Sequence, residues 1–519
     1  MTQKCIALLS NLSMNQDPYL PTYVTDDPVL SENTFRTTQP NLTAPPLWES
    51  ARRLLPRPFW QGHEETVACY WRVWELAWRN LMTPKPDTGF IAPFIDTAFN
   101  GCLFMWDSVF ILEYGRYGRR AFNFQQTLDN FYGLQHKDGY ICREINWTTG
   151  QERFSRFDPV STGPNILAWS EWNHWLTLGD RDRLTRVFPS LVAYHRWMRF
   201  YRTWPDHTYW SCGWGCGMDN QPRTPPWPEG NHCFHHGFQS WIDATAQALL
   251  SAHLLTQMSD ILGRPDVADD LRREASLLRR VINETMWNER LCSYVDRHRD
   301  GTPSEVLGVG GFWMLLDEQL PEDRVAAMVA LLQDPLHFNR PHRVPSLSTK
   351  DPSYDPTGGY WLGGVWPPTN LMILRGLHLQ KQSEPAFAIA TNHVENVTKV
   401  FTKTNTVWEN YAPETAAPGN PAKGDFAGWS GLGPVAVLFE SVFGLQPDAP
   451  SGCLIWNIHL TDAFGVEDYP FGTKGLLSLR SESRAFCTDE PQVNISSNIP
   501  LTVQLHWKGG SRNIRVAPK

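Results

Sequence analysis

The chain has no excess of positive charge and no long apolar run. Its 519 residues include 46 Lys and Arg against 54 Asp and Glu, which gives a formal net charge of −8 at pH 7. A nucleic-acid groove needs clustered basic residues, so we expect no nucleic-acid partner. No apolar stretch approaches the ~18 residues that a membrane-spanning helix requires, so we expect no membrane segment.

Cysteines are few for this length and are scattered. The ten cysteines form no dense framework, which predicts reduced thiols rather than a disulfide-stabilised secreted domain. The apolar run at 5–9 is shorter than the ~7–15 residues of a secretory signal core, so we predict a cytoplasmic protein. Cys212 and Cys216 lack the paired Cys-x2-Cys spacing of zinc sites, although histidines follow at 232–236. We therefore expect neither a metal nor another cofactor.

Tryptophan, in contrast, is abundant. The chain has 24 Trp, and aromatic residues make up 13% of it. An indole offers a flat apolar face and one N–H donor, which suits the C–H faces and hydroxyl edges of a sugar ring. We expect about half of the tryptophans to pack between helices, since aromatic side chains dominate core burial. The others favour a carbohydrate site.

Apolar periodicity predicts a mainly α chain with twelve helices. The expected helices lie at 63–81, 107–118, 121–135, 163–178, 181–202, 239–262, 265–286, 306–318, 321–333, 367–380, 383–402 and 430–443. Twelve helices in six hairpins are typical of an (α/α)6 barrel. The segments 306–316 and 434–443 are apolar nearly all round, as inner helices require, whereas 266–281 is amphipathic, as an outer helix is.

The chain divides into three predicted regions. Residues 1–60 are rich in Pro, Thr and Asn and form an N-terminal arm, and 61–446 form the barrel. Residues 447–519 alternate apolar and polar side chains and predict a small β-domain. Two long aromatic loops, at 203–238 and 340–366, interrupt the helices. Long loops on a rigid scaffold usually carry function, so we expect them to wall the site.

Two carboxylates lie in segments crowded with Trp, Gly and Pro: Asp219 and Glu409. A carboxyl group against aromatic rings loses hydration, and its acid form is favoured. Cleavage of a glycosidic bond needs one carboxyl kept protonated and another kept ionised. The pair therefore points to an enzyme that acts on sugars. Glu414, close to Glu409, is a rival for the role of base.

Several other polar residues have two readings each. Asp107 is either the N-cap of a helix or a contact for sugar hydroxyls, with Trp106 beside it as a stacking wall. Arg143 and Glu144 either hold hydroxyls or form a local ion pair on a surface loop. Asp243 begins a helix, and we interpret it as a cap or a structural hydrogen-bonding group.

Four motifs carry a resemblance to a known family. Trp106-Asp107-Ser108 and the aromatic after it resemble the first signature of trehalases and glycoside hydrolase family 63, and 359–370 is similar to that family's Tyr-Trp…Trp-Pro-Pro signature. The segments 408–415 and 428–430 resemble its base segment. The segment 217–223 looks like the acid segment of the mannosylglycerate and glucosylglycerate hydrolase branch. Residues 416–423 look like an insertion.

The resemblance implies an inverting glycosidase that removes a terminal α-linked sugar, with glucose as the default, from a small glycoside or oligosaccharide. Asp219 would be the general acid and Glu409 the general base, with their carboxyl groups ~6.5–9.5 Å apart. The candidate substrate-binding residues are Trp106, Asp107, Gln135, Trp214, Asn220, Arg223, Tyr360, Trp361, Trp366, Trp408, Tyr411 and Trp429.

Three other classes of protein remain open at this point. A phosphorylase or transglycosylase on the same barrel would need an anion site and no base for water, so a well-placed Glu409 argues against it. A non-catalytic carbohydrate-binding protein would be expected to lack one carboxylate, and both are present. A lyase would favour Tyr, His and Arg around an acidic sugar, whereas the site expected here is acidic and rich in tryptophan.

Overall fold

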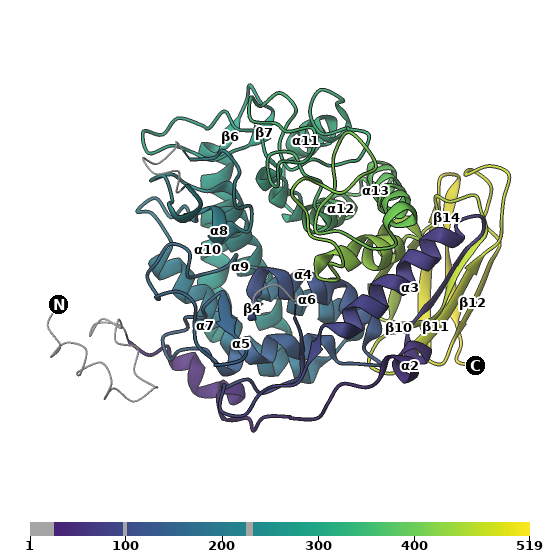
Figure 1. The fold of residues 1–519 in the computed structure, drawn as a ribbon, viewed down its shortest axis with the longest axis horizontal. Helices are drawn as coiled ribbons and strands as arrows, with labels where there is room; N and C mark the ends of the chain where they lie inside the picture. The colour runs from purple at the N-terminus through teal and green to yellow at the C-terminus, as the bar shows by residue number, and fades with distance from the viewer. Residues whose placement is uncertain (1–24, 97–100, 225–231) are drawn as a thin grey trace, which may run out of the picture.

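The computed structural model describes residues 25–96, 101–224 and 232–519, and it is mainly helical with a smaller portion of sheet (Figure 1). Each of the twelve predicted helices coincides with a helical segment. Their bounds are α3 Glu64–Arg79, α4 Met105–Gly115, α5 Asp129–Gly133 with the preceding turn η5 Phe124–Leu128, α6 Leu167–Leu178, α7 Arg181–Tyr201, α9 Ile242–Leu262, α10 Pro265–Thr285, η7 Val309–Leu316, α11 Glu322–Gln333, α12 Pro367–Leu379, α13 Ser383–Thr404 and η9 Leu432–Val442. Two of them are not α-helices, because η7 is a 3-10 helix and η9 a π-helix.

Six helical segments close a ring. Along the chain, α4 packs on α6, α6 on α9, α9 on η7, η7 on α12, α12 on η9, and η9 returns to α4. Every residue of η7 and η9 is buried, which agrees with their mostly apolar composition. In α10, which packs outside α9, the buried positions follow a helical period, with Val267, Leu271 and Leu278 among them.

Eight of the strands form two four-stranded sheets beside the helices, and those of the C-terminal part are seen in yellow in Figure 1. One sheet has the order β1-β10-β11-β12 and the other β14-β13-β9-β8. The bounds are β1 Arg57–Trp60, β8 Leu445–Asp448, β9 Cys453–Asn457, β10 Phe464–Phe471, β11 Gly475–Ser481, β12 Val493–Ser497, β13 Leu501–Trp507 and β14 Gly510–Val516. The expected C-terminal strands are therefore present. The three-region division stays a prediction, and β1 joins the segment before the first long helix to the C-terminal sheet through its antiparallel pairing with β10.

The N-terminal segment packs on the helices from residue 25 onward, while residues 1–24 lie outside the described part. Two 3-10 turns, η1 Pro28–Glu32 and η2 Thr34–Thr37, contact α7 and α5 respectively. Phe35 is fully buried, and its ring centroid lies 5.3 Å from that of Tyr132. This aromatic contact explains why a segment with little periodicity is nevertheless ordered against the body.

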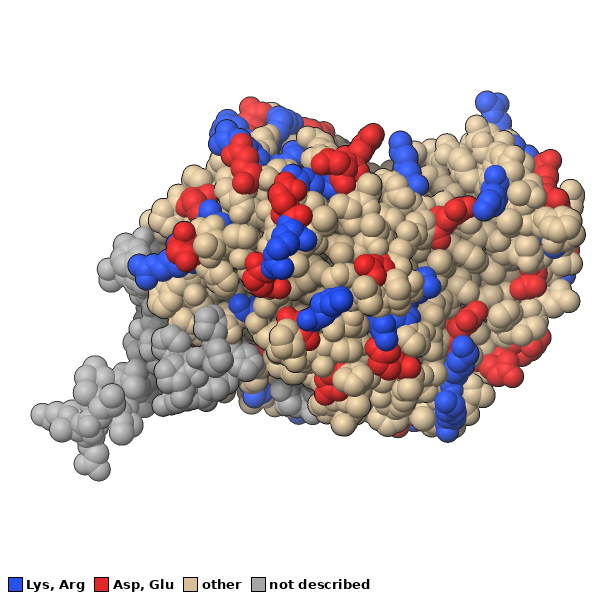
Figure 2. Space-filling model, turned by 90° about the horizontal axis from the view of Figure 1, so that it is seen from above, with Lys and Arg blue, Asp and Glu red and all other residues tan. Residues whose placement is uncertain are grey.

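Lys and Arg side chains are interspersed with Asp and Glu on the face shown in Figure 2. This mixture agrees with the small net charge of the chain. Across 25–96, 101–224 and 232–519, no helix is both long enough and apolar enough to cross a membrane.

Candidate active site

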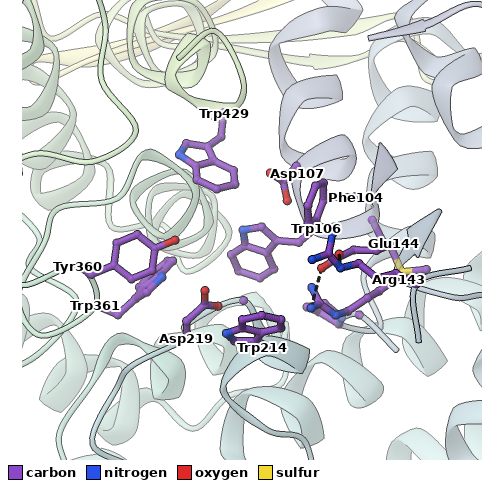
Figure 3. Close-up of a pocket in the computed structure, with 15 residues that line it drawn as sticks. Phe104, Trp106, Asp107, Arg143, Glu144, Trp214, Asp219, Tyr360, Trp361 and Trp429 are labelled. Carbon is purple, nitrogen blue, oxygen red and sulfur yellow. Dashed lines mark ion pairs between the residues drawn. The ribbon is translucent and has the colours of Figure 1, made fainter. Parts of the chain in front are cut away.

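A cavity of about 160 Å³ lies where the start of α4 meets the loops around it, and aromatic side chains dominate its wall (Figure 3). The short strands β4 Cys102–Phe104 and β5 Glu144–Asn146 pair directly before the start of α4 and bring these segments together. The lining residues are Phe104, Met105, Trp106, Asp107, Arg143, Glu144, Arg153, Gly163, Pro164, Trp214, Gly217, Asp219, Tyr360, Trp361 and Trp429.

Asp219 reaches the cavity because a glycine allows the chain to turn there. The short helix α8 Gly213–Cys216 ends at Gly217, which has φ +78°. A Cβ at this position would lie 2.7 Å from the ring of Trp106, so only glycine permits so close an approach. The turn directs Asp219 into the cavity, where it lies near Trp106 and Trp214 in Figure 3.

The environment of Asp219 favours its acid form. Burial of the carboxyl in the aromatic cavity raises its pKa to about 7. The positive charge of Arg143 opposes this rise, whereas the negative charges of Glu409 and Glu144 add to it. At neutral pH a substantial fraction of this carboxyl therefore carries a proton, which a general acid requires.

Glu409 is buried behind the cavity wall and is held by its neighbours. Its main-chain N–H donates to Lys423 O at 2.9 Å, and the N–H of Lys423 returns a hydrogen bond to Glu409 Oε2 at 3.3 Å. The hydroxyl of Tyr360, a lining residue, lies 3.4 Å from Glu409 Oε1, and the indole of Trp429 donates to Glu409 O at 2.8 Å. Burial raises the pKa of Glu409, but the Lys423 N–H and the Tyr360 hydroxyl oppose the rise because they stabilise its carboxylate.

Residues 416–423, which look like an insertion in the sequence, fold back on the segment that carries Glu409. The N–H of Gly419 donates to Asn410 O at 3.0 Å, and the Asn410 amide donates to Pro421 O at 3.1 Å. Together with the two bonds between Glu409 and Lys423, these contacts hold Glu409 and the residue after it. The insertion therefore supports the candidate base.

Glu414 is occupied elsewhere. Arg340 donates to its two carboxylate oxygens at 2.8 and 2.6 Å, and the Tyr354 hydroxyl donates at 2.7 Å. The hydrogen bonds from Arg340 lower the pKa of Glu414. Neither Glu409 nor Glu414 is among the described residues that line the cavity, but Glu409 contacts the lining residue Tyr360, whereas Arg340 and Tyr354, the partners of Glu414, lie outside the lining. The geometry thus favours Glu409 over Glu414 as the base.

The tryptophan wall is built in two layers. Trp361 faces the cavity and stacks on Trp366, with ring centroids 3.9 Å apart and planes inclined by 2°. Trp366 is fully buried, and its indole donates to Tyr360 O at 3.1 Å. Tyr360 has φ +66°, a backbone conformation that is unusual for a bulky side chain and is found mostly at functional sites. Trp366 was predicted to contact substrate, but here it supports Trp361 and Tyr360 from behind.

Trp106 and Asp107 carry polar atoms with no partner in the described protein. Both residues are buried, and neither the indole N–H of Trp106 nor Oδ1 of Asp107 has a hydrogen-bond partner among the described residues. Unpaired buried polar atoms are costly, so their position at a cavity indicates groups that a ligand would satisfy. The alternative that Asp107 caps the helix is wrong, since the N-cap position of α4 is Phe104.

Arg143 and Glu144 line the cavity rather than a surface loop. Their side chains are 11% and 4% exposed, and Arg143 Nη2 lies 2.7 Å from Glu144 Oε1. Arg153 also lines the cavity, and its Nε lies 3.3 Å from Glu144 Oε2. The sequence reasoning missed Arg153. Arg153 lies in a short polar connection that carries no motif. Its position shortly after β5 is the one signal that could have identified it as a residue of the cavity wall.

Two of the polar candidates have structural partners instead. Gln135 Nε2 donates to Gly139 O and Ser190 O, both at 2.9 Å, and neither acceptor lines the cavity. Gln135 lies outside the described cavity wall, and its role as a substrate contact stays a prediction. Asn220 donates to Gly359 O at 2.9 Å and accepts from the Trp361 N–H at 2.8 Å. Asn220 thus ties the Asp219 segment to the aromatic wall.

Arg223, another candidate substrate contact, also has structural partners. It is buried between two carboxylates, with Nη2 at 2.8 Å from Asp243 Oδ1 and at 2.6 Å from Asp296 Oδ1. The charge of this guanidinium is already balanced by the two carboxylates. Because Asp243 belongs to α9, the group joins α9 to the segment that carries Asp219. The interpretation of Asp243 as a structural hydrogen-bonding group agrees with this contact.

Trp408 and Tyr411 also lie outside the set of described lining residues. The main-chain N–H of Trp408 donates to the Tyr411 hydroxyl at 3.2 Å, and its indole donates to Thr404 Oγ1 at 3.1 Å. Both residues therefore support the segment of Glu409 rather than facing a ligand. Trp106, Asp107, Trp214, Asp219, Tyr360, Trp361 and Trp429 are the predicted residues that the cavity wall brings together.

The cysteines near Asp219 have local roles. Cys212 and Cys216 are free and buried, and the Gly215 N–H donates to Cys212 Sγ at 3.3 Å. Within the described ranges, no three His, Cys, Asp or Glu residues are grouped to hold a metal ion.

Comparison with known families decides the class of the protein. A family model described as the mannosylglycerate hydrolase MGH1-like glycoside hydrolase domain matches residues 103–430, a range that contains every residue of the cavity wall. The chain belongs to this glycoside hydrolase family. The resemblance drawn from the four motifs is confirmed, and the protein is a glycosidase.

Individual relatives agree with this assignment. A probable mannosyl-oligosaccharide glucosidase of Schizosaccharomyces pombe is 27% identical over 285 residues, which are 52% of this chain and 33% of that protein. The chain thus spans about a third of that relative's length. A structure of a family 63 mannosylglycerate hydrolase from Thermus thermophilus in complex with glucose is 17% identical, with a TM-score of 0.57, and covers 70% of this chain and 99% of its own.

A third similarity extends beyond the helical part. A family 78 rhamnosidase structure from Bacillus sp. GL1 is 12% identical, with a TM-score of 0.59, and covers 87% of this chain and 42% of its own. At this identity the likeness concerns the fold alone. The rhamnosidase structure covers 87% of this chain, whereas the hydrolase from Thermus thermophilus covers 70%. This chain therefore shares more of its architecture with the rhamnosidase.

Proposed function

We propose that the protein is an inverting glycosidase in which Asp219 is the general acid and Glu409 the general base. The observation that carries the proposal is the contrast between their surroundings. Burial keeps a proton on Asp219 near neutral pH, whereas the Lys423 N–H and the Tyr360 hydroxyl stabilise the carboxylate of Glu409. Two carboxyl groups with different protonation states are what acid- and base-assisted hydrolysis needs.

In the proposed reaction the Asp219 carboxyl donates its proton to the glycosidic oxygen. The bond between that oxygen and the anomeric carbon breaks, and its electron pair leaves with the oxygen. Glu409 takes a proton from a water molecule, whose oxygen attacks the anomeric carbon from the opposite face. Trp361 and Trp106 would flank the sugar, and Asp107 would accept hydrogen bonds from its hydroxyls, since its Oδ1 has no partner among the described residues.

The scaffold of this site is proposed to be an (α/α)6 barrel. The closed sequence of contacts through α4, α6, α9, η7, α12 and η9 supports six inner helices. The other long helices would form the outer layer, and α10 has the one-sided burial expected there. Aromatic loops at one end of such a ring would enclose the cavity.

The proposed substrate is a small glycoside with a terminal α-linked sugar, glucose by default. A cavity of about 160 Å³ that is lined by four tryptophans, three of them buried, supports a site for one sugar unit rather than a groove for a polymer. Glucose is present in the complex of the Thermus thermophilus hydrolase, and the relative from Schizosaccharomyces pombe is described as a probable glucosidase.

A hydrolysis screen of α-linked disaccharides and glycosyl-glycerates tests the proposal. We expect release of single monosaccharides from small substrates and no long fragments from an α-glucan. Endo-type fragments from the glucan would contradict the pocket, and turnover that requires inorganic phosphate would identify a phosphorylase instead. Binding of sugars without any turnover across the screen would identify a carbohydrate-binding protein.

The rate should fall as the pH rises through about 7. Asp219 must be protonated to act as the acid, and its pKa lies at about 7, so deprotonation above that pH removes the active form. On the acidic side, activity should fall where Glu409 becomes protonated, because its pKa is raised above the ordinary value of 4.5. A profile of kcat/KM against pH for an unactivated substrate measures both limbs. A rate that stays constant from about pH 6 to 9 would argue against Asp219 as the acid.

A further inference from the structure

Arg143 is held at the cavity by hydrogen bonds of both its backbone and its side chain. Its main-chain N–H donates to Ser161 O at 2.9 Å, and its main-chain O accepts from the Met105 N–H at 2.8 Å. The side chain is fixed as well, because Nε donates to Val160 O at 2.7 Å. With its side chain 11% exposed, the guanidinium is shielded from solvent. A shielded charge acts more strongly on its neighbours than an exposed one does.

The guanidinium also touches the element that carries Asp219. It lies over the ring of Phe154 at 4.9 Å and over the ring of Trp214 at 5.6 Å. Trp214 belongs to α8, which leads through Gly217 to Asp219. Cation–π contacts of this length are attractive, so Arg143 and α8 hold each other in place. Figure 3 shows Arg143, Trp214 and Asp219 on the wall of the same cavity.

We propose that Arg143 is a positioning residue for the general acid: its fixed positive charge stabilises the Asp219 carboxylate that forms as the proton leaves, and so sets the pH range in which the enzyme works. This inference rests on the proposed function of Asp219. Without an opposing cation, a carboxyl in such an apolar cavity would hold its proton too firmly to donate it efficiently, because burial and the nearby carboxylates both favour the acid form.

The other ionisable groups around Asp219 come from several elements. The charges that act on it include Arg143, which lowers its pKa, and Glu409 and Glu144, which raise it. Within the described ranges, the other ionisable groups on the cavity wall or beside Asp219 include Asp107, Arg153, Tyr360, Cys212 and Cys233. Of the two arginines on the wall, Arg143 has the shielded side chain, whereas the Arg153 side chain is 44% exposed.

Arg143→Met keeps the length of the side chain and removes its charge, and Arg143→Lys keeps the charge. For an unactivated substrate, we expect Arg143→Met to move the basic limb of the kcat/KM profile up by about one pH unit or more. Its maximal kcat should also fall, since the departing proton leaves an unstabilised carboxylate. In Arg143→Lys, the basic limb should lie closer to its wild-type pH than it does in Arg143→Met. Arg153→Met is the matched control, and its shift should be smaller because solvent screens that charge.

Glu144→Gln tests the same idea with the opposite sign. Glu144 adds negative charge near Asp219 and pairs with Arg143, so its neutralisation should move the basic limb to lower pH. This variant also keeps the inference testable if Arg143→Met folds poorly. If the basic limb shifts in opposite directions in Arg143→Met and Glu144→Gln, the role of Arg143 is through charge. General damage to the fold would not shift the limb in opposite directions in the two variants.

Two results would overturn the inference. One is a basic limb that stays at its wild-type pH in both Arg143→Met and Glu144→Gln. The other is an equal loss of rate for Arg143→Met on unactivated substrates and on substrates whose leaving group needs no acid, which would mark Arg143 as merely structural. Failure of the acid assignment would be seen separately, as an Asp219→Asn variant that retains both its rate and its basic limb.

Discussion

Replacing Asp219 by asparagine, or Glu409 by glutamine, is expected to lower kcat for an unactivated glycoside by about 10²–10⁴-fold in each case. Both substitutions preserve shape and remove an ionisable proton site. Asp219 lies on a cavity, and the two backbone hydrogen bonds of Glu409 do not depend on its side chain, so the folded structure should persist. Steady-state kinetics on purified protein, with circular dichroism as the check on folding, measures the effect.

Glu414→Gln is the control for the base. Its carboxylate pairs with Arg340 and the Tyr354 hydroxyl away from the cavity, so the loss of rate should be much smaller than for Glu409→Gln. A larger loss for Glu414→Gln would transfer the role of base to that residue. Near wild-type rates for either of the two main variants would reject the assignment of that residue.

A leaving group that departs without protonation separates the two roles. With such a substrate the Asp219→Asn variant should recover much of its rate, because the acid is no longer needed. Glu409→Gln should stay slow, since the attacking water still needs a base. If the rates of Asp219→Asn and Glu409→Gln recovered equally, the assignment of the acid role to Asp219 and the base role to Glu409 would be wrong.

Much of the helical fold could be predicted from local patterns. Segments such as α9 and α10 are long and strongly periodic, and their predicted positions agree with the observed bounds to within a few residues. The pairing of β1 with β10 could not be predicted, because Pro58 meets Val466 across the whole helical part of the chain. The π-helical form of η9 was equally hidden, since its apolar sequence is compatible with any buried helix.

Some residues of the site could likewise be predicted from their own segment of the sequence, whereas the contacts of others depend on residues far along the chain. Trp106, Asp107, Asp219 and Tyr360 lie in segments whose composition already indicated a site, and they line the cavity. Arg223 follows Asp219 closely in sequence, but its direction depends on Asp296, which lies far along the chain. The local sequence, a basic residue beside a candidate acid, predicts a substrate contact and gives no sign that Arg223 is paired with Asp243 and Asp296.

The stereochemistry of the product gives the second large effect: an α-glycoside should yield the β-sugar as its first product. Glu409 and Asp219 come from different loops, and Tyr360, which lines the cavity together with Asp219, places its hydroxyl 3.4 Å from Glu409 Oε1. For inversion we expect the two carboxyl groups to have the wider spacing of ~6.5–9.5 Å, which leaves room for a water molecule. Direct attack by a carboxylate needs the shorter spacing of ~5–5.5 Å.

Proton NMR of the anomeric signals in the first minutes of turnover, before mutarotation, identifies the product. The β-anomer should appear first and the α-anomer only as the sugar equilibrates. With Glu409→Gln this initial signal should be lost, because the variant can no longer activate the water. If the α-anomer appeared first, or a glycosyl-enzyme on Glu409 were trapped, Glu409 would be a nucleophile. The mechanism would then be retaining, while membership of the glycoside hydrolase family would stand.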